Sequence, residues 1–390
     1  MSENKSLQTT LVHTDYRAPE GFSALPMAVH HASTVVFDNV AAMRNRRWHG
    51  KGGYTYGLHG TPTTFTLEGR LAEIEDGRHC VLTSSGLSAL ALVNFAFLKA
   101  GDHVLIPDNA YNPNRELGAW MSRDFGIAVD YYDPLIGVGI GALIRDNTRL
   151  IWTEAPGSIS MEVPDIPAIC QVARQRGVLT AIDNTWSAGL AFRAFEHGVD
   201  IVMQALTKYQ SGGSDVLMGA VITRDPQLME RLEYAHMRLG HGVSVEDAYL
   251  VLRSLSSLKL RFDAHDKSAR KIAEWLQARP EIAKVLHPAL PDCPGHETWK
   301  RDFTGAGGLF SVLFDKAYAE AQTDRFVDSL KLFKIGYSWG GAHSLCVPYR
   351  MPEIRKTWGE EGILVRFNIG LEDADDLIAD ILQALQQLNS

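Results

Sequence analysis

Residues 178–213, VLTAIDNTWSAGLAFRAFEHGVDIVMQALTKYQSGG, decide how this chain folds. They contain two apolar, β-branched runs, and each run ends in a charged residue, the first at Asp183 and the second at Lys208. Both runs are predicted to be buried strands of an open α/β sheet, in which ligands bind at the carboxyl ends of the strands. An acid and an amine at that edge indicate a ligand that requires both.

Pyridoxal phosphate meets that requirement, because its aldehyde bonds to a lysine amine and its ring nitrogen stays protonated only beside a carboxylate. The residues before Lys208 are nearly all apolar, so burial is expected to lower the pKa of its amine and to favour this bond. Considered alone, Lys208 could be a surface lysine at a strand end, and Asp183 could cap the residues that follow it.

A second unit of strand, turn and helix supplies a candidate phosphate site. Residues 79–83 are predicted to form a strand, residues 84–88 a turn of small residues, and an apolar helix follows as far as Lys99. Gly86 allows a close approach of the backbone, and the unpaired amides at a helix N-terminus point at an anion. An ordinary N-capped helix explains the same turn when it is considered alone.

The rest of the chain continues this alternation up to about residue 250. Further strands are predicted at residues 103–107, 127–132, 149–154, 178–182 and 199–207, and helices at 63–75, 113–124, 166–176 and 245–258. Such alternation predicts a mainly parallel sheet that helices cover on both faces.

The C-terminal part has a different pattern, with helices at residues 267–278 and 377–388 and strands at 284–287 and 308–314. We therefore expect three parts: an N-terminal arm of residues 1–60, a large domain of residues 61–250 and a small α+β domain of residues 251–390. The arm shows no sustained helical period, so it is expected to become ordered by packing on a second subunit.

The composition is typical of a globular enzyme without a polyanionic partner. Hydrophobic residues make up 45% and charged residues 22% of the 390 residues, and the net charge is -8. No basic run is present, which argues against nucleic acid and membrane partners. The four cysteines form no C-x-x-C pair, and neither a signal peptide nor a membrane span is indicated. We expect a cytoplasmic protein with reduced thiols and no metal site.

One motif favours an alternative from another class, an NAD-dependent oxidoreductase. Residues 137–142, GVGIGA, partly fit the dinucleotide fingerprint G-x-G-x-x-G/A, and Glu154 lies at roughly the expected distance. Residues 143–146 leave little room for the long helix that a dinucleotide site needs, which disfavours this alternative.

Motifs along the whole chain resemble one family. They are YTY at 54–56, GTPT at 60–63, SG at 85–86, DNAY at 108–111, DPLIG at 133–137, IDNTW at 182–186, TKY at 207–209, YSWGG at 337–341 and Arg366. Together they resemble the Cys/Met-metabolism family of fold-type I pyridoxal-phosphate enzymes. Residues 154–162, EAPGSISME, resemble the β-lyase branch, because γ-synthase and γ-lyase relatives usually carry an asparagine in a Pro-x-Asn-Pro stretch there. The resemblance also accounts for residues 133–137, which overlap the partial dinucleotide fingerprint, as a family segment that has no role in nucleotide binding.

The resemblance implies a transferase-like α/β fold, with a mainly parallel seven-stranded sheet in the large domain. It implies pyridoxal 5'-phosphate as cofactor, an amino-acid substrate and a homo-oligomer, a tetramer of active dimers. The implied reaction is β-elimination of L-cystathionine to homocysteine, pyruvate and ammonia, a step of methionine biosynthesis. A broader cysteine-S-conjugate β-lyase, a γ-synthase or γ-lyase, and a cofactor-bound regulator with vestigial activity remain alternatives.

Matching the motifs residue by residue implies a cofactor site. Its residues are Lys208, Asp183, Tyr111, Ser85, Gly86, Leu87, Thr207 and Tyr56. Lys208 would bond to the cofactor and remove the substrate Cα proton, with Tyr111 and Tyr56 as further catalytic residues. Asp183 would pair with the ring nitrogen, Tyr111 would stack on the ring, and Tyr56 would reach the cofactor of the neighbouring subunit.

The resemblance also implies a substrate site, formed by Arg366, Ser338, Trp339 and Tyr337. Arg366 would bind the α-carboxylate through its two-pronged guanidinium. Alternation along residues 364–368 also permits a plainer explanation, in which Arg366 is a surface residue of a strand.

Two positions depart from the family pattern at the phosphate. The family commonly has an arginine where this chain has Leu58 and a serine where it has Ala205. We therefore predict that a basic residue of the arm, His59, Arg46 or Arg47, contributes to cofactor affinity.

Overall fold

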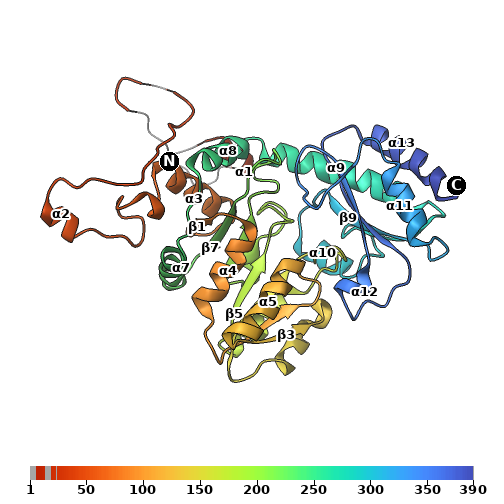
Figure 1. The fold of residues 1–390 in the computed structure, drawn as a ribbon, viewed down its shortest axis with the longest axis horizontal. Coiled ribbons are helices and arrows are strands. Elements are labelled where there is room, and N and C mark those ends of the chain that lie inside the picture. Colours follow the sequence, from red (N-terminus) through yellow and green to blue (C-terminus); the bar gives the residue numbers. More distant parts are fainter. Residues whose placement is uncertain (1–5, 14–18, 23, 390) are drawn as a thin grey trace.

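A computed structural model describes residues 6–13, 19–22 and 24–389 of the chain. Figure 1 shows an elongated molecule, in which the N-terminal arm extends from one end and the C-terminal helix α13, Ala374–Leu385, lies at the other. Two sheets lie between them. The larger sheet carries most of the candidate site, and the smaller sheet covers one side of it.

The larger sheet has seven strands in the order β1-β7-β6-β5-β4-β2-β3. The strands are β1 His79–Thr83, β2 His103–Pro107, β3 Ala128–Tyr132, β4 Thr148–Glu154, β5 Leu179–Asp183, β6 Ile201–Ala205 and β7 Gly219–Thr223. Neighbouring strands from β6 to β3 are parallel, whereas β7 is antiparallel to both β1 and β6. The mainly parallel, seven-stranded sheet is thus confirmed, although the sequence patterns did not predict β7.

Helices pack on both faces of this sheet. They are α3 Pro62–Ile74, α4 Gly86–Phe97, α5 Asn112–Phe125, α6 Ile166–Gln175, α7 Pro226–Leu239 and α8 Val245–Leu255. Successive strand residues enter different cores: Ala181 packs in one cluster and Ile182 in another, and Ile201 and Val202 divide in the same way. Because both faces are buried, the strands read as continuous apolar runs rather than as alternating ones.

The smaller sheet has the order β10-β11-β12-β9-β8 and is mainly antiparallel. Its strands are β8 Ile282–Leu286, β9 Leu309–Phe314, β10 Lys334–Ile335, β11 Leu345–Tyr349 and β12 Leu364–Asn368, and its helices are α9 Leu258–Gln277, α10 His296–Asp302, α11 Glu320–Asp328, α12 Met351–Ile354 and α13. This arrangement confirms the expected α+β character of the C-terminal part.

The connection between the two sheets differs from the prediction. The helix expected over residues 245–258 ends at Leu255. The 20-residue helix α9 begins at Leu258, nine residues before the helix predicted over residues 267–278, and ends at Gln277. Its first half packs in the core of the larger sheet, through Leu258 and Phe262. Its second half packs in the core of the smaller sheet, so α9 joins the two cores.

The arm contains the short helices α1 Leu7–Val12 and α2 Val40–Arg44 and the 3₁₀ turn η1 Gly57–His59. No residue of α2 is buried, and Val36 and Leu25 are among the most exposed large apolar side chains of the described chain. Figure 1 shows α2 at the tip of a long excursion away from the sheets.

The glycine-rich stretch of residues 137–142 does not form a dinucleotide site. It belongs to the 3₁₀ segment η2, Pro134–Ala142, which is kinked at Gly137. The next element is β4, so the long helix that the fingerprint requires is missing between η2 and β4. Two other 3₁₀ segments are η3 Ala194–His197 and η4 Gln386–Asn389.

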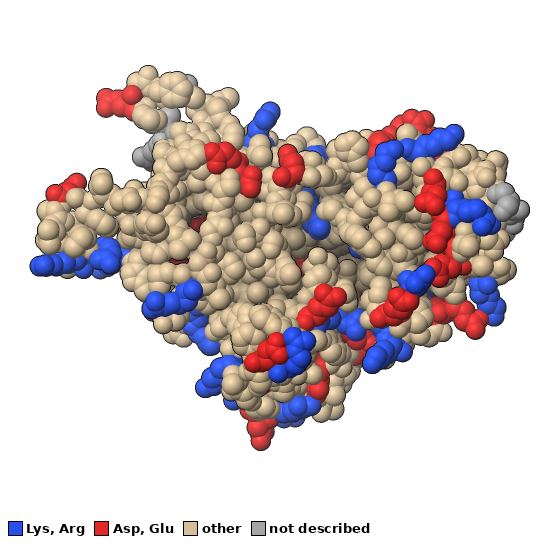
Figure 2. Space-filling view, viewed as in Figure 1, with Lys and Arg blue, Asp and Glu red and all other residues tan. Residues whose placement is uncertain are grey.

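All four cysteines, Cys80, Cys170, Cys293 and Cys346, are unpaired and buried. On the face shown in Figure 2, acidic and basic side chains are mixed rather than gathered by sign. Within the described ranges no helix has the length and apolar character needed to cross a bilayer. The same ranges hold no cluster of His, Cys, Asp and Glu suited to a metal ion.

Candidate active site

A pocket opens at the carboxyl ends of the central strands β4, β5 and β6. Asp183 is the last residue of β5, Glu154 is the last residue of β4, and the two are paired in register. Lys208 follows the end of β6. The sequence-predicted residues that line this pocket are Ser85, Gly86, Leu87, Tyr111, Asp183, Thr207, Lys208 and Trp339.

The Lys208 amine lies in a closed, polar position. Its Nζ donates a hydrogen bond of 3.0 Å to Ser338 Oγ and lies 5.4 Å from the centre of the Trp339 ring. Burial lowers the pKa of Lys208 to about 8; the positive charge of Arg366 lowers it further, and Asp183 opposes both. A substantial share of the amine is therefore neutral, and nucleophilic, near pH 7.5.

The Asp183 carboxylate is anchored by its neighbour Thr185. Oδ1 accepts the Thr185 amide at 3.0 Å and also the Thr185 hydroxyl, whose oxygen accepts the Ala205 amide at 2.9 Å. Burial raises the pKa of Asp183, while the hydrogen bonds from Thr185 and the charge of Lys208 hold it down. The carboxylate is thus fixed between the ends of β5 and β6, facing the pocket.

Glu154 is a pocket residue that we did not predict from the sequence. Its Oε2 accepts the backbone amide of Tyr111 at 2.8 Å, which holds the start of α5 against the end of β4. Burial, followed by the negative charge of Asp183, raises its pKa well above the usual range. The available signal was a carboxylate at the end of a buried strand, the same signal that identified Asp183.

The start of α4 forms an anion cradle beside this pair. Ser85 caps the helix by accepting the Ser88 amide at 3.0 Å, and the amides of Gly86 and Leu87 have no acceptor within the helix. A Cβ added to Gly86 would lie 2.7 Å from Ala205 Cβ, so only glycine permits this approach to β6. The cradle therefore fits a phosphate at the helix N-terminus. Ala205, which stands where the family commonly has a serine, packs directly against the cradle.

A second pocket continues from the first through Tyr111, Thr207, Lys208 and Trp339, which line both. Tyr337, Ser338 and Arg366 line only the second pocket. Arg366, on β12, is 6% exposed; its Nη2 donates a 2.6 Å hydrogen bond to the Tyr337 carbonyl, and its guanidinium lies 5.3 Å from the Tyr349 ring. Burial lowers its pKa.

Arg366 is thus a buried strand residue and not a surface one. The ion pairs found in the described chain include none between Arg366 and an acidic side chain. A buried guanidinium beside a pocket and without a carboxylate is suited to bind the carboxylate of a ligand.

Tyr56 lines neither pocket of its own chain. It forms a backbone bridge with Thr34, and its hydroxyl accepts a 3.4 Å hydrogen bond from Ser33 Oγ. Its expected contact with a neighbouring subunit stays a prediction. So does the expectation that His59, Arg46 or Arg47 takes the role of the family arginine that Leu58 replaces.

The sheet order, the lysine and aspartate at neighbouring strand ends and the cradle define a pyridoxal-phosphate enzyme of fold type I. The family model described as Cys/Met metabolism PLP-dependent enzyme matches residues 8–386. The chain belongs to this family.

Its relatives carry several activities in their names. The cystathionine beta-lyase of Escherichia coli is 39% identical over 387 residues, which is 97% of this chain and 98% of that protein. The L-alanine/L-glutamate racemase of Wolbachia pipientis is 39% identical over 86% of this chain and 83% of that protein. The crystal structure of cystathionine gamma synthase from Xanthomonas oryzae, in complex with aminoacrylate and cysteine, is 30% identical with a TM-score of 0.91, covering 99% of both chains.

Proposed function

We propose that this enzyme catalyses β-elimination of L-cystathionine, which consumes water and yields homocysteine, pyruvate and ammonia in methionine biosynthesis. The observation that carries the proposal is the position of Lys208 where the two pockets join, with Asp183 in the first pocket and Arg366 in the second. The name cystathionine beta-lyase, carried by relatives 37–39% identical over nearly the full chain, supports this reaction over others on the same cofactor.

The roles of the side chains follow from their positions. Pyridoxal phosphate, when bound, withdraws electrons from the Cα of the amino acid. Asp183 supplies the negative charge that keeps the ring nitrogen protonated, and the cradle at Gly86 holds the phosphate. Arg366 binds the α-carboxylate and so orients the Cα–H bond toward Lys208. The neutral amine of Lys208, held by Ser338, accepts the Cα proton, and the C–S bond at Cβ then breaks.

Incubation with L-cystathionine and pyridoxal phosphate tests this proposal by product analysis. Equal amounts of pyruvate and homocysteine are expected, and the Lys208→Ala variant should produce neither. Formation of 2-oxobutyrate and cysteine would favour a γ-lyase, and racemisation of L-alanine without elimination would favour a racemase. Elimination from many cysteine S-conjugates at similar rates would indicate the broader β-lyase. A visible absorption band that borohydride bleaches would exclude the nicotinamide alternative.

We also propose the assembly and the cellular compartment. The enzyme works as a homo-oligomer, a tetramer of active dimers, in the cytoplasm, and residues 1–60 form an arm that places Tyr56 at the neighbouring pocket. The exposed apolar side chains of the arm and the four unpaired thiols support this proposal. Mixing the inactive variants Lys208→Ala and Tyr56→Ala should restore activity if one site draws on two chains.

The division of the remaining chain into domains 61–250 and 251–390 is part of the same proposal. The boundary falls inside α8 and shortly before α9. Separate expression of residues 61–250 would test it, because a domain should fold without the smaller sheet.

A further inference from the structure

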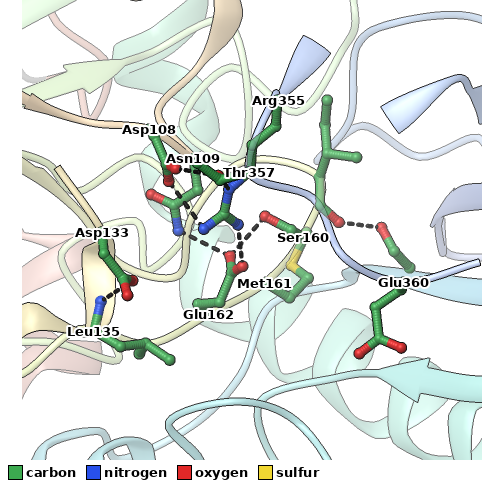
Figure 3. Close-up of polar contacts among 12 residues, drawn as sticks. Asp108, Asn109, Asp133, Leu135, Ser160, Met161, Glu162, Arg355, Thr357 and Glu360 are labelled. Carbon is green, nitrogen blue, oxygen red and sulfur yellow. Dashed lines mark hydrogen bonds and ion pairs between the residues drawn. The ribbon is translucent and has the colours of Figure 1, made fainter. Parts of the chain in front are cut away.

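Figure 3 shows a buried ionic cluster formed by Arg355, Glu162 and Asp108. Arg355 forms an ion pair with Glu162 through Nη1 and with Asp108 through Nη2, the latter at 2.9 Å. The exposed fractions of the three side chains are 11%, 8% and 12%. Most ion pairs of this chain are far more exposed than these, and buried ones of this kind are costly to break.

The cluster joins parts of the chain that are distant in sequence. Asp108 and Asn109 follow β2, and Glu162 lies in the loop between β4 and α6. Glu162 accepts further hydrogen bonds from Asn109 Nδ2 at 2.9 Å and from Ser160 Oγ at 2.6 Å, and Asp108 accepts one from Thr357 Oγ1 at 2.6 Å. In Figure 3 the Arg355 guanidinium lies between the two carboxylates. Arg355 thereby ties the chain after α12 to two loops of the larger sheet.

The segment held in this way is a wall of the second pocket. Tyr349, Arg350, Glu353 and Ile354 line that pocket and lie immediately before Arg355. α12 has four residues, too few to be stable through its own hydrogen bonds, and of these only Met351 is buried. A second arginine, Arg115 of α5, donates to the Ile354 carbonyl. We call residues 349–354 the α12 wall. Its position relative to the larger sheet therefore depends on the contacts that Arg355 and Arg115 make at its C-terminal end.

We infer that Arg355 is a positioning residue that sets the width of the second pocket and so the enzyme's affinity for substrates that extend beyond Cβ. This inference rests on the proposed function, because it concerns how the homocysteine half of L-cystathionine is accommodated. A small substrate occupies only the space between Lys208 and Arg366. L-Cystathionine adds a second amino-acid group past the sulfur, and the α12 wall borders the space where that group must lie.

The test compares Arg355→Gln with Arg301→Gln. Arg301 also contacts two carboxylates, Asp165 and Asp302, but it lines neither pocket. In Arg355→Gln, KM for L-cystathionine should rise about tenfold or more, whereas KM for β-chloro-L-alanine should change less than about threefold. Arg301→Gln should leave both values near those of the wild type. Arg355→Lys keeps the charge but cannot bridge both carboxylates, so it should show a smaller rise and provides a folded variant if the glutamine variant is unstable.

Hydrogen–deuterium exchange of residues 349–357 gives a readout that does not depend on turnover. Exchange there should be faster in Arg355→Gln than in the wild type and unchanged in Arg301→Gln. Unchanged exchange, or equal losses on the long and the short substrate, would overturn the inference. A wild-type enzyme that acts on β-chloro-L-alanine but not on L-cystathionine would overturn the proposed function alone. In that case S-alkyl-L-cysteines of increasing length would replace L-cystathionine, and only a KM effect that grows with chain length would support the inference.

Discussion

Replacing Arg366 by lysine tests the substrate-binding half of the site. The guanidinium is buried, bonded to the Tyr337 carbonyl and without an acidic partner in the described chain, so its free N–H groups are available to a ligand carboxylate. A lysine keeps the positive charge but loses the second of two parallel hydrogen bonds. At about 2 kcal/mol for a hydrogen bond between charged groups, kcat/KM for any amino-acid substrate should fall about 30-fold.

The charge of Arg366 also acts on Lys208, and a second variant separates this effect. Arg366 is the largest cause, after burial, of the lowered pKa of Lys208. Arg366→Lys should leave the pKa of that amine near 8, whereas Arg366→Gln should raise it and lose still more activity. The pKa can be read from the pH dependence of covalent pyridoxal-phosphate uptake by apoenzyme, followed by absorbance.

Cofactor affinity and thermal stability are the controls for both variants. In Arg366→Lys the dissociation constant of pyridoxal phosphate should stay within about threefold of the wild-type value, because position 366 lies in the second pocket, away from the cradle, and the positive charge near Lys208 is kept. In Arg366→Gln it should stay so only above the raised pKa of Lys208. The reasoning is refuted if Arg366→Lys retains wild-type kcat/KM, or if kcat/KM falls only in proportion to lost cofactor.

Three further predictions concern the cofactor site. Gly86→Ala should weaken pyridoxal-phosphate binding by about tenfold or more in a spectroscopic titration, because the added Cβ would lie 2.7 Å from that of Ala205 and would push α4 away from β6. Asp183→Asn should lower kcat by about a hundredfold or more while cofactor still binds, because the ring nitrogen loses its negative partner; nearly normal kcat in stopped assays would contradict the assigned role. Covalent cofactor uptake by wild-type apoenzyme should rise with pH to a midpoint near 8, since only the neutral Lys208 amine reacts and its pKa is lowered; a midpoint near 10 would show that the amine is not buried.

The sequence predicted those parts of the fold that are encoded locally. β5 and β6 were predictable because each is a mainly apolar run buried on both faces. A charged residue marks the end of each run, Asp183 as the last residue of β5 and Lys208 three residues after β6. β7 was missed because GAVIT is a short apolar run, for which periodicity does not distinguish a strand from a buried helix. β11 contains Pro348, which argues against a strand in a sequence pattern, and yet it pairs with β12.

The residues of the site also fall into those that a local sequence pattern reveals and those that only the tertiary fold brings together. Asp183 and Lys208 were predictable because a charge at the end of an apolar run needs an explanation. Contacts such as that between Arg355 and Glu162, which lie 193 residues apart, have no local pattern, because only the tertiary fold brings them together. The role of Tyr56 depends on a second chain, so neither one sequence nor one subunit decides it.

The four buried thiols make the enzyme its own reporter of conformational opening. Burial raises the pKa of each thiol, that of Cys170 to about 12, so the reactive thiolate is scarce in the native state. Cys80, Cys170 and Cys293 lie in a core of the larger sheet, whereas Cys346 lies in the core of the smaller one. Alkylation rates at single cysteines would therefore measure how often each of the two cores opens to solvent, and no cysteine would have to be introduced by mutation.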